Sequence, residues 1–297
     1  VRFWHDPLRR AAAQTRELLT LAAAERLSVP PASLAAEDGQ IIHVASGRRV
    51  PFGDLVQAAS ALPVPQTPVL RPAEQRKLTG KTMRRIDTPG KVTGRALYAV
   101  DMKAPGMLHG AVRLSPVFRA EVESMDPASV RGMPGVVAVV PVPNGAVVVA
   151  RSWWQAKQAA DKLTIRFKAT PNDRVSTPEL DERMRAALDG GTLPAALQRG
   201  DMDAAFRAPH RIVEADYAVP LLAHACMEPI NCMAQAGADR LDLWTGTQAQ
   251  DILLRDCGAV GGYKPEQVYF HNAYLGGGFG RKTHAQAAVQ AMLASPA

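Results

Sequence analysis

The stretch Leu275-Gly276-Gly277-Gly278-Phe279-Gly280-Arg281-Lys282 decides the fold of this chain. A run typical of a strand, residues 267–275, precedes it, and a run typical of a helix, residues 283–293, follows it. Glycine has no Cβ, so the backbone of such a loop can approach a ligand closely. Its N–H groups can converge on an anion, helped by the positive end of the following helix. The loop therefore predicts a binding site for a large, phosphate-bearing cofactor.

The composition is that of a globular protein and does not by itself indicate a function. The 297 residues are enough for two domains with cores, and 47% hydrophobic and 21% charged residues are ordinary for a globular chain. No apolar run approaches the roughly 18–20 residues that span a bilayer. The net charge is +7, but the basic residues are scattered and aromatic residues make up only 5%. This pattern favours a solvated surface with a few phosphate contacts over a nucleic-acid interface.

Three cysteines, Cys226, Cys232 and Cys257, occur without a CxxC motif. Three thiols cannot supply the four ligands of an iron–sulfur cluster or a structural zinc site. We expect each cysteine to be a small buried hydrophobic residue. If the protein passes electrons to a cluster, that cluster belongs to another chain.

The first 83 residues predict a small α+β segment followed by a linker. A helix is expected over residues 8–27, where Ala, Arg, Glu and Leu dominate. A short strand over 41–44 and a second helix over 52–61 follow. The proline-rich residues 63–72 resemble a linker. We therefore assign residues 1–62 to a partial N-terminal α+β segment and residues 63–83 to the linker.

Residues 84–180 predict an α+β module of short strands and few helices. Its expected elements are a turn at 87–90, strands at 91–100, 107–114, 136–140, 146–150 and 164–167, and a helix at 153–163.

A polar crossover with one helix, residues 178–188, leads to a last unit that includes the glycine loop. Its expected elements are a short helix from 201 to 206, strands at 211–219, 231–236 and 241–245, and a helix at 248–260. The fold class predicted for the whole chain is α+β.

Four features of the last 80 residues could carry chemistry: the segment His224-Ala225-Cys226-Met227-Glu228-Pro229, the pair Thr247-Gln248, the glycine loop, and Arg281-Lys282. Each alone has a plainer interpretation. The loop could simply turn the chain, His224 could be a structural histidine, and Glu228 could be an ordinary loop carboxylate. The loop is neither a GxGxxG fingerprint with a following acidic residue nor a Walker loop, which argues against a nicotinamide or flavin enzyme.

Taken together, the order and spacing of these features resemble the large, molybdenum-binding subunits of the xanthine oxidase and aldehyde oxidase family. Within that family the resemblance is to the isoquinoline 1-oxidoreductase branch, and to its β chain in particular. It rests on the stretches RRIDTPGKVTGRALYAVDMKAPGMLHGAVRL (84–114), GDMDAAF (200–206), VPLLAHACMEPINC (219–232) and GGGFGR (276–281). It implies a hammerhead-like α/β domain at 84–180, followed by the first part of the molybdopterin-binding domain at 181–297. It also implies that the segment 1–62 is a partial N-terminal piece of the cofactor-binding region.

The resemblance also implies how the cofactor is held. Molybdenum is bound by the dithiolene of a pterin, so no protein ligand to the metal is expected. Gln248 would donate its amide to an oxo group, and Gly276, Gly277, Gly278 and Gly280 would let the backbone pack against the pterin and its phosphates. Phe279 would face the metal site. Arg281 could balance phosphate charge of a molybdopterin cytosine dinucleotide, although other branches have glycine there.

The implied reaction is hydroxylation of an N-heterocycle or an aldehyde with oxygen from water. Electrons would leave through a small [2Fe–2S] partner subunit. The family's catalytic glutamate follows the glycine loop, and no carboxylate follows Lys282 here. We therefore expect this chain to be a piece of a larger subunit that cannot turn over substrate alone. The alternative is an inactive remnant that at most binds nucleotide or cofactor. The resemblance further implies a periplasmic or membrane-associated location.

Overall fold

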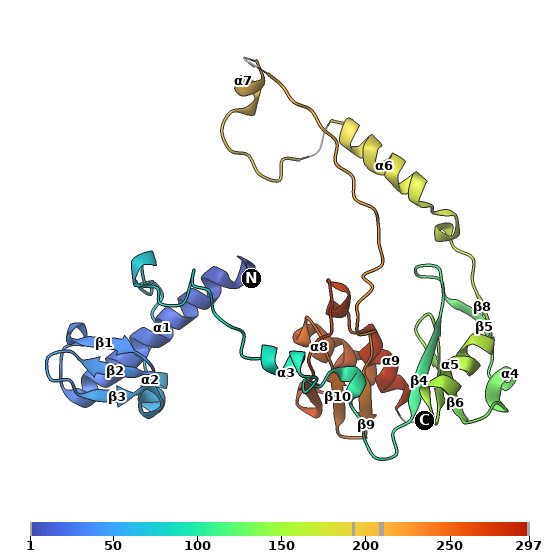
Figure 1. Ribbon diagram of the computed structural model, residues 1–297, viewed down its shortest axis with the longest axis horizontal. Helices are drawn as coiled ribbons and strands as arrows, with labels where there is room; N and C mark the ends of the chain where they lie inside the picture. Colours follow the sequence, from blue (N-terminus) through green and yellow to red (C-terminus); the bar gives the residue numbers. More distant parts are fainter. Residues whose placement is uncertain (1, 192–193, 208–210, 296–297) are drawn as a thin grey trace. The chain divides into compact units, whose positions relative to one another are not determined.

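The computed structural model describes residues 2–191, 194–207 and 211–295, and it confirms the α+β class (Figure 1). The chain divides into two compact units, Val1–Ile86 and Asp87–Ala297. The α-helices are α1 (Arg2–Leu27), α2 (Val56–Ser60), α3 (Thr88–Val92), α4 (Ala128–Arg131), α5 (Trp153–Lys162), α6 (Thr177–Asp189), α7 (Met202–Arg207), α8 (Gln250–Gly261) and α9 (Gln286–Ala294). The strands are β1 (Leu34–Glu37), β2 (Gln40–His43), β3 (Arg49–Pro51), β4 (His109–Leu114), β5 (Val122–Asp126), β6 (Val136–Val142), β7 (Gly145–Ala150), β8 (Thr164–Phe167), β9 (Met233–Ala236), β10 (Leu241–Thr245) and β11 (Val268–Asn272).

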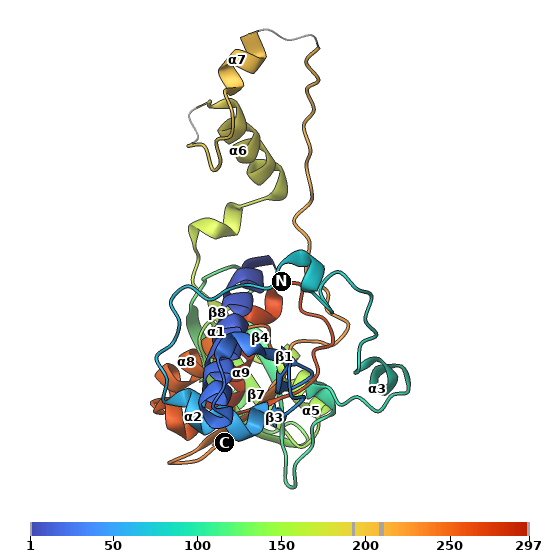
Figure 2. The same cartoon turned by 90° about the vertical axis from the view of Figure 1, so that its left-hand side faces the viewer.

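The first unit packs the long helix α1 against an antiparallel sheet of order β1-β2-β3. Figure 2 brings this unit to the front, where α1 and α2 contact each other. Its core is formed by Leu19, Ala22 and Ala23 of α1 with Ile41 and Leu55. The helix begins earlier than the sequence predicts, at Arg2, and ends at Leu27 as expected.

The proline-rich segment 63–72 is hydrogen-bonded along α1. Arg9 and Arg10 donate to the carbonyls of Arg71 and Gln66, and Gln14 donates to that of Pro65. Because Pro-rich chain has few N–H donors of its own, these helix side chains satisfy its carbonyls instead.

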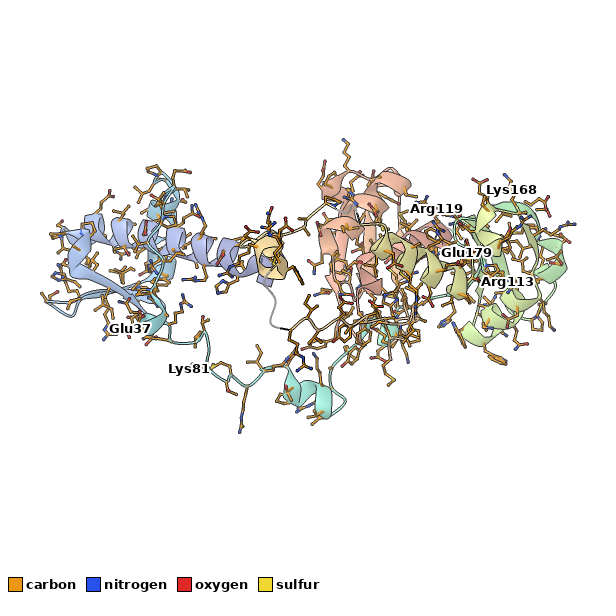
Figure 3. The ribbon with its side chains drawn as sticks, turned by 90° about the horizontal axis from the view of Figure 1, so that it is seen from above. Glu37, Lys81, Arg113, Arg119, Lys168 and Glu179 are labelled. Atoms are coloured by element: carbon orange, nitrogen blue, oxygen red, sulfur yellow. The ribbon has the colours of Figure 1, made fainter. Side chains whose placement is uncertain are left out.

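The second unit begins with a sheet of order β4-β7-β6, in which β7 is central. Every residue of β7 is buried, because α5 packs on one face of the sheet and α9 contacts the other. The side chain of Ser152 caps α5 by accepting the N–H of Gln155 at 3.3 Å. Beside this sheet, β5 and β8 form an antiparallel ribbon that ends at an exposed pair between Lys168, labelled in Figure 3, and Glu121 at 2.8 Å.

The last part of the second unit is a sheet of order β11-β10-β9, with β10 and β11 parallel. Helices α8 and α9 cover one face of it. The core there contains Leu241, Leu243, Leu253 and Met292. The predicted strand at 241–245 is confirmed, and α8 begins two residues later than predicted.

Two predicted strands are wrong. Residues 91–100 contain the end of α3 and a short 3-10 turn. Pro89 favours the first turn of a helix, and a 2.7 Å ion pair between Lys91 and Asp87 stabilises this turn. Residues 211–219 form no strand and lie exposed. A strand needs a neighbour for its N–H and C=O groups, and no described segment pairs with this one. The strand β5 is absent from the sequence-based prediction. No helix among the described residues is both long enough and apolar enough to cross a membrane.

Candidate cofactor site

The glycine loop follows β11 and precedes a short 3-10 turn, Arg281–Thr283, so α9 starts only at Gln286. The helix predicted directly after the loop, at 283–293, therefore begins three residues late. The first turn of α9 does not adjoin the glycines in sequence. The loop's own backbone conformation, rather than the end of a long helix, shapes the site.

The loop contains three residues in the left-handed region: Gly277 at φ +98°, Phe279 at φ +51° and Gly280 at φ +97°. Glycine adopts such values without strain, whereas phenylalanine does so rarely. Phe279 is also 72% exposed. A strained aromatic residue held outward on a loop is typical of functional sites, where surrounding contacts maintain the strain.

Two glycines are needed because other predicted features pass directly against them. A Cβ on Gly276 would clash with the side chain of Glu228, and a Cβ on Gly278 would clash with that of Gln248. The structure thus brings the glycine loop, the 224–229 segment and the Thr247-Gln248 pair into direct contact, although they are well separated in sequence.

Gln248 lies in the short connection between β10 and α8, two residues before the helix begins. Its backbone N–H donates to the Lys282 carbonyl at 2.9 Å, and its side-chain Oε1 accepts the Gly280 N–H at 3.0 Å. Gln248 is exposed, and its Nε2 donates to no acceptor within the described part of the chain. The side chain is therefore oriented by its oxygen, and its two amide hydrogens remain available.

A buried ion pair lies directly beneath the loop. Lys282 Nζ donates to Glu228 Oε2 at 2.6 Å, and the residues are only 3% and 6% exposed. The same Oε2 accepts the Gly276 N–H at 2.9 Å. The other oxygen, Oε1, accepts the Val100 N–H at 3.3 Å and Asn231 Nδ2 at 3.4 Å.

Burial by itself would raise the pKa of the Glu228 carboxyl, since it disfavours the charged form. The hydrogen bonds from Lys282 and from the Gly276 N–H outweigh that effect, and the pKa of Glu228 is lowered. The backbone N–H of Glu228 also donates to the Gly276 carbonyl at 3.0 Å. Glu228 is therefore a charged structural acceptor, which corrects its plainer interpretation as an ordinary loop carboxylate.

The two cations after the loop differ in role. Lys282 is enclosed by its pair with Glu228. Arg281 is partly exposed, and its Nη2 donates to Gln286 Oε1 at 2.7 Å. Only Arg281 of these two is positioned to meet an anion at the surface.

Cys226 also contacts the loop, since its Sγ lies 3.5 Å from the Gly278 carbonyl oxygen. The preceding residue, Ala225, has φ +44°, a second non-glycine residue in the left-handed region beside the loop. His224 is exposed. Of the three cysteines, Cys257 is fully buried as expected and burial raises the pKa of its thiol to about 12, whereas Cys226 and Cys232 are partly buried.

The segment around Tyr98 completes the site, and the sequence does not predict it. Tyr98 forms an isolated parallel bridge with Tyr274, whose N–H donates to the Leu97 carbonyl at 3.2 Å. Their rings lie 6.1 Å apart. A single bridge leaves no periodic signal in the sequence, so only the tertiary structure reveals it.

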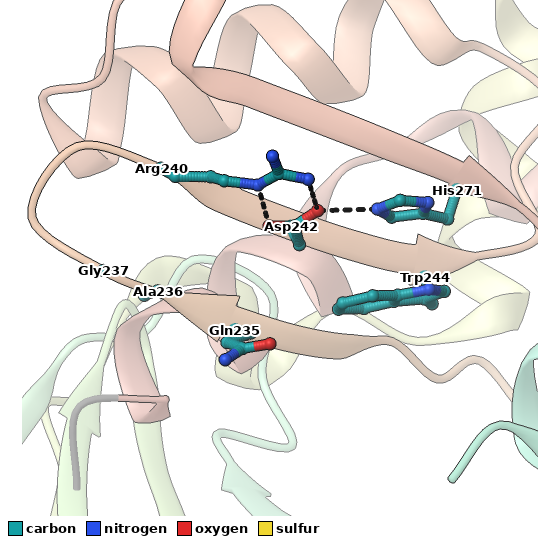
Figure 4. Close-up of a pocket in the computed structure, with 7 residues that line it drawn as sticks. All are labelled: Gln235, Ala236, Gly237, Arg240, Asp242, Trp244 and His271. Atoms are coloured by element: carbon teal, nitrogen blue, oxygen red, sulfur yellow. Dashed lines mark hydrogen bonds and ion pairs between the residues drawn. The ribbon is translucent and has the colours of Figure 1, made fainter. Parts of the chain in front are cut away.

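A second polar cluster lies on the sheet face opposite α8 and α9 (Figure 4). Arg240 donates two hydrogen bonds to Asp242, at 2.6 and 2.8 Å, and His271 Nε2 lies 2.6 Å from Asp242 Oδ1. The ring of His271 stacks on Trp244 with centroids 4.5 Å apart. The bond from Arg240 holds the pKa of Asp242 at about 2, below its ordinary value of 3.8. Nothing in the sequence pattern beyond strand alternation could have identified this cluster.

The described residues contain no group of three or more His, Cys, Asp or Glu side chains that could hold a metal ion. The polar groups at the loop are instead backbone N–H groups, one amide and one guanidinium. This donor set suits a large anionic organic ligand better than a bare ion.

Comparison with known proteins decides the family. Residues 189–297 match the model of the molybdopterin cofactor-binding domain. The chain is 33% identical over 260 residues to a nicotinate dehydrogenase chain of Pseudomonas putida, covering 84% of this chain and 22% of that protein. It is 30% identical over 330 residues to the β chain of isoquinoline 1-oxidoreductase of Brevundimonas diminuta, covering 97% of this chain and 42% of that protein.

The chain belongs to the molybdenum-binding subunits of the xanthine oxidase family. This confirms the resemblance that the sequence motifs indicated. Quinoline 2-oxidoreductase from Pseudomonas putida 86 has the same fold over 71% of this chain and 32% of its own, with a TM-score of 0.53 and 22% identity. The chain thus spans less than half the length of these relatives, and its glycine loop lies within the matched molybdopterin-binding domain.

Proposed function

We propose that this chain forms one wall of the cofactor site of a molybdenum hydroxylase, with residues 276–280 and Gln248 closest to the cofactor. The observation that carries the proposal is the junction between Gln248 and Gly280. Because Gln248 Oε1 accepts the Gly280 N–H at 3.0 Å, the exposed amide keeps two hydrogens for a bound ligand. A neutral donor therefore stands beside a backbone that a large ligand can approach closely.

The residues present fit molybdopterin. Gly276 and Gly278 leave no room for a Cβ on the inner side of the loop, where Glu228 and Gln248 pack. Gly280 has nothing within 4 Å of the place where a Cβ would stand, so this part of the loop is open. The loop thus exposes its backbone at Gly280, while Glu228 and Gln248 hold its inner side in place.

When bound, molybdopterin would supply the redox chemistry, in which water-derived oxygen is added to a substrate carbon and two electrons are removed. The chain's own residues would bind and orient. Gln248 would hold an amide hydrogen toward an oxygen of the group, and Phe279 would shield that position from water. These roles for Gln248 and Phe279 are predictions.

The finer identity of the cofactor is also part of the proposal. A molybdopterin cytosine dinucleotide carries a pyrophosphate, and Arg281 is a partly exposed guanidinium at the end of the loop. Since one of its amino groups donates to Gln286, the side chain is held in place with further donors available for phosphate oxygens.

The substrate class proposed is an N-heterocycle or an aldehyde. Support comes from the relatives, which are named for nicotinate and for isoquinoline, both nitrogen heterocycles. A small [2Fe–2S] subunit is proposed as the electron-accepting partner, because the three cysteines here cannot ligate a cluster on their own.

Glu228 is not proposed as the catalytic base. A general base must reach the proton that it removes. Glu228 is enclosed, its oxygens are engaged by Lys282, Gly276, Val100 and Asn231, and its lowered pKa makes it a weak base.

The experiment is to produce the chain in a host that makes molybdopterin and to measure pterin and molybdenum per chain after purification. We expect pterin to copurify with the unmodified chain. Gln248→Glu keeps an oxygen for the Gly280 N–H but removes the amide donor, and it should lower retained pterin about tenfold.

The matched control is Gln250→Glu, which makes the same change at an exposed residue two positions away, at the start of α8. It should retain pterin like the unmodified chain. Purification without pterin, or with a flavin or nicotinamide instead, would overturn the proposal.

A periplasmic or membrane-associated location is a further part of this proposal. The membrane-associated alternative is supported by the name of one relative, the membrane-bound aldehyde dehydrogenase of Gluconacetobacter polyoxogenes, which is 27% identical over 310 residues. Fractionation of the native host would test it, and recovery in the cytoplasmic fraction alone would contradict it.

A further inference from the structure

We infer that Glu228 and Lys282 are positioning residues for the cofactor loop: together they set the distance between the glycine backbone and Gln248. The effect on the cofactor rests on the proposed function, whereas the effect on the loop does not. The inference comes from the way in which this one pair links every segment of the site.

Lys282 joins two of these segments. Its backbone carbonyl accepts the Gln248 N–H at 2.9 Å and the Thr247 hydroxyl at 2.9 Å, so it fixes the end of β10 beside the loop. Its side chain turns inward and ends on Glu228 Oε2 at 2.6 Å. Movement of Lys282 would therefore move Gln248 relative to Gly280.

Glu228 joins the remaining segments. It holds Gly276 from both sides, since Oε2 accepts the Gly276 N–H and the Glu228 N–H donates to the Gly276 carbonyl. Its other oxygen accepts the Val100 N–H, which brings in the segment that also bridges Tyr274. One carboxylate thus anchors the start of the loop, while Lys282 anchors its end.

The burial of Glu228 and Lys282 shows that they position the loop and do not bind a ligand directly. Residues that are 6% and 3% exposed and that neutralise each other do not present charge to a phosphate or a substrate. Replacing a buried ion pair by neutral residues is often harmless to stability, whereas removing one partner is harmful. Stability and positioning can therefore be measured separately.

The test compares Glu228→Gln, Lys282→Met and the double variant in the full chain. Three quantities are measured: the thermal midpoint, the hydrogen exchange of the Gly280 amide region, and the retained pterin. Each single variant should lower the midpoint and speed loop exchange. The double variant should recover the midpoint while its loop exchange stays about tenfold or more faster and its pterin content about tenfold or more lower than in the unmodified chain.

The control is Lys103→Met, which removes the charge of an exposed lysine in the same unit and should change none of the three quantities. Recovery of loop protection together with the midpoint in the double variant would overturn the inference, because the pair would then matter for stability alone. If the unmodified chain retains no pterin but loop exchange behaves as expected, the positioning role stands and the proposed function fails.

Discussion

At the scale of single residues, the glycines of the loop are not equivalent. Gly278 has an ordinary φ, and a Cβ there would meet the end of the Gln248 side chain. Gly280 has φ +97° and open space around it. Position 278 therefore needs glycine because there is no room for a Cβ, whereas position 280 needs glycine because of its positive φ. Substitutions at the two positions should separate these two requirements.

Gly278→Ala should lower the thermal midpoint little, because the flexible Gln248 side chain can rotate away, but it should break the Gln248–Gly280 bond and abolish pterin retention. Gly280→Ala should cost about 1–2 kcal/mol of stability, since an L-residue is strained there. Denaturant unfolding and pterin content measure the two effects. Gly132→Ala, at φ −82° in open space, is the control and should change neither. Equal stability losses at positions 278 and 280 would contradict this division.

The lowered pKa of Asp242 predicts that the stability of the protein depends on pH. Its folded pKa of about 2 lies below the ordinary 3.8, so its contribution is complete above pH 3.8 and is lost as the pH falls toward 2. Asp242→Asn should lower stability at neutral pH and flatten the loss between these two pH values. Thermal unfolding from pH 2 to 7 measures the effect. An unchanged acid limb in the variant would show that the Arg240–Asp242–His271 cluster does not contribute.

At the scale of elements, β7 is the most constrained strand. It reads Gly-Ala-Val-Val-Val-Ala, and all six residues are buried because it lies between β4 and β6 with a helix on each face. A strand buried on both faces reads as a continuous apolar run rather than an alternating one. The strand that the sequence predicts at 146–150 is confirmed, one residue shorter than β7.

Val148→Ala should destabilise the second unit by about 2 kcal/mol, because it removes two methyl groups from the core against α5. Val137→Ala, at a 43% exposed position of β6, is the control and should have a much smaller effect. Urea unfolding followed by circular dichroism measures both. Equal losses would contradict the packing of α5 on this face.

The predicted elements that proved right share local causes. The helices α5 and α6 are capped by Ser152 and Ser176, the residues just before them, whose side chains accept N–H groups three residues on. The two wrong strands, 91–100 and 211–219, have apolar residues at suitable spacing. Within 91–100 only Tyr98 pairs, in a single bridge with Tyr274, and 211–219 pairs with no described segment. Strand formation depends on a neighbouring strand that can lie anywhere in the sequence, so local pattern alone could not exclude them.

At the scale of the whole molecule, the division into Val1–Ile86 and Asp87–Ala297 predicts where proteases act first. Lys81 is exposed in the connecting stretch, and Arg199 is exposed in the segment between α6 and α7. Limited trypsin digestion followed by mass spectrometry should find early cuts after these two residues, because proteases need exposed chain without regular structure. Lys157 in α5 should resist. First cuts within α1 or α5 would contradict the division.

The sequence by itself determined the α+β class, most helices, the glycine loop and the family, because each depends on local composition, turn residues or a contiguous motif. Only the tertiary structure decided how the site is assembled. Lys282 lies 54 residues from Glu228 in sequence, and Gln248 lies 32 residues from Gly280. No local pattern states that these residues meet, since their contact follows from the parallel pairing of β10 with β11 and from the packing of the chain around the loop. That packing makes Glu228 and Lys282 a buried pair and leaves Gln248 and Phe279 facing outward.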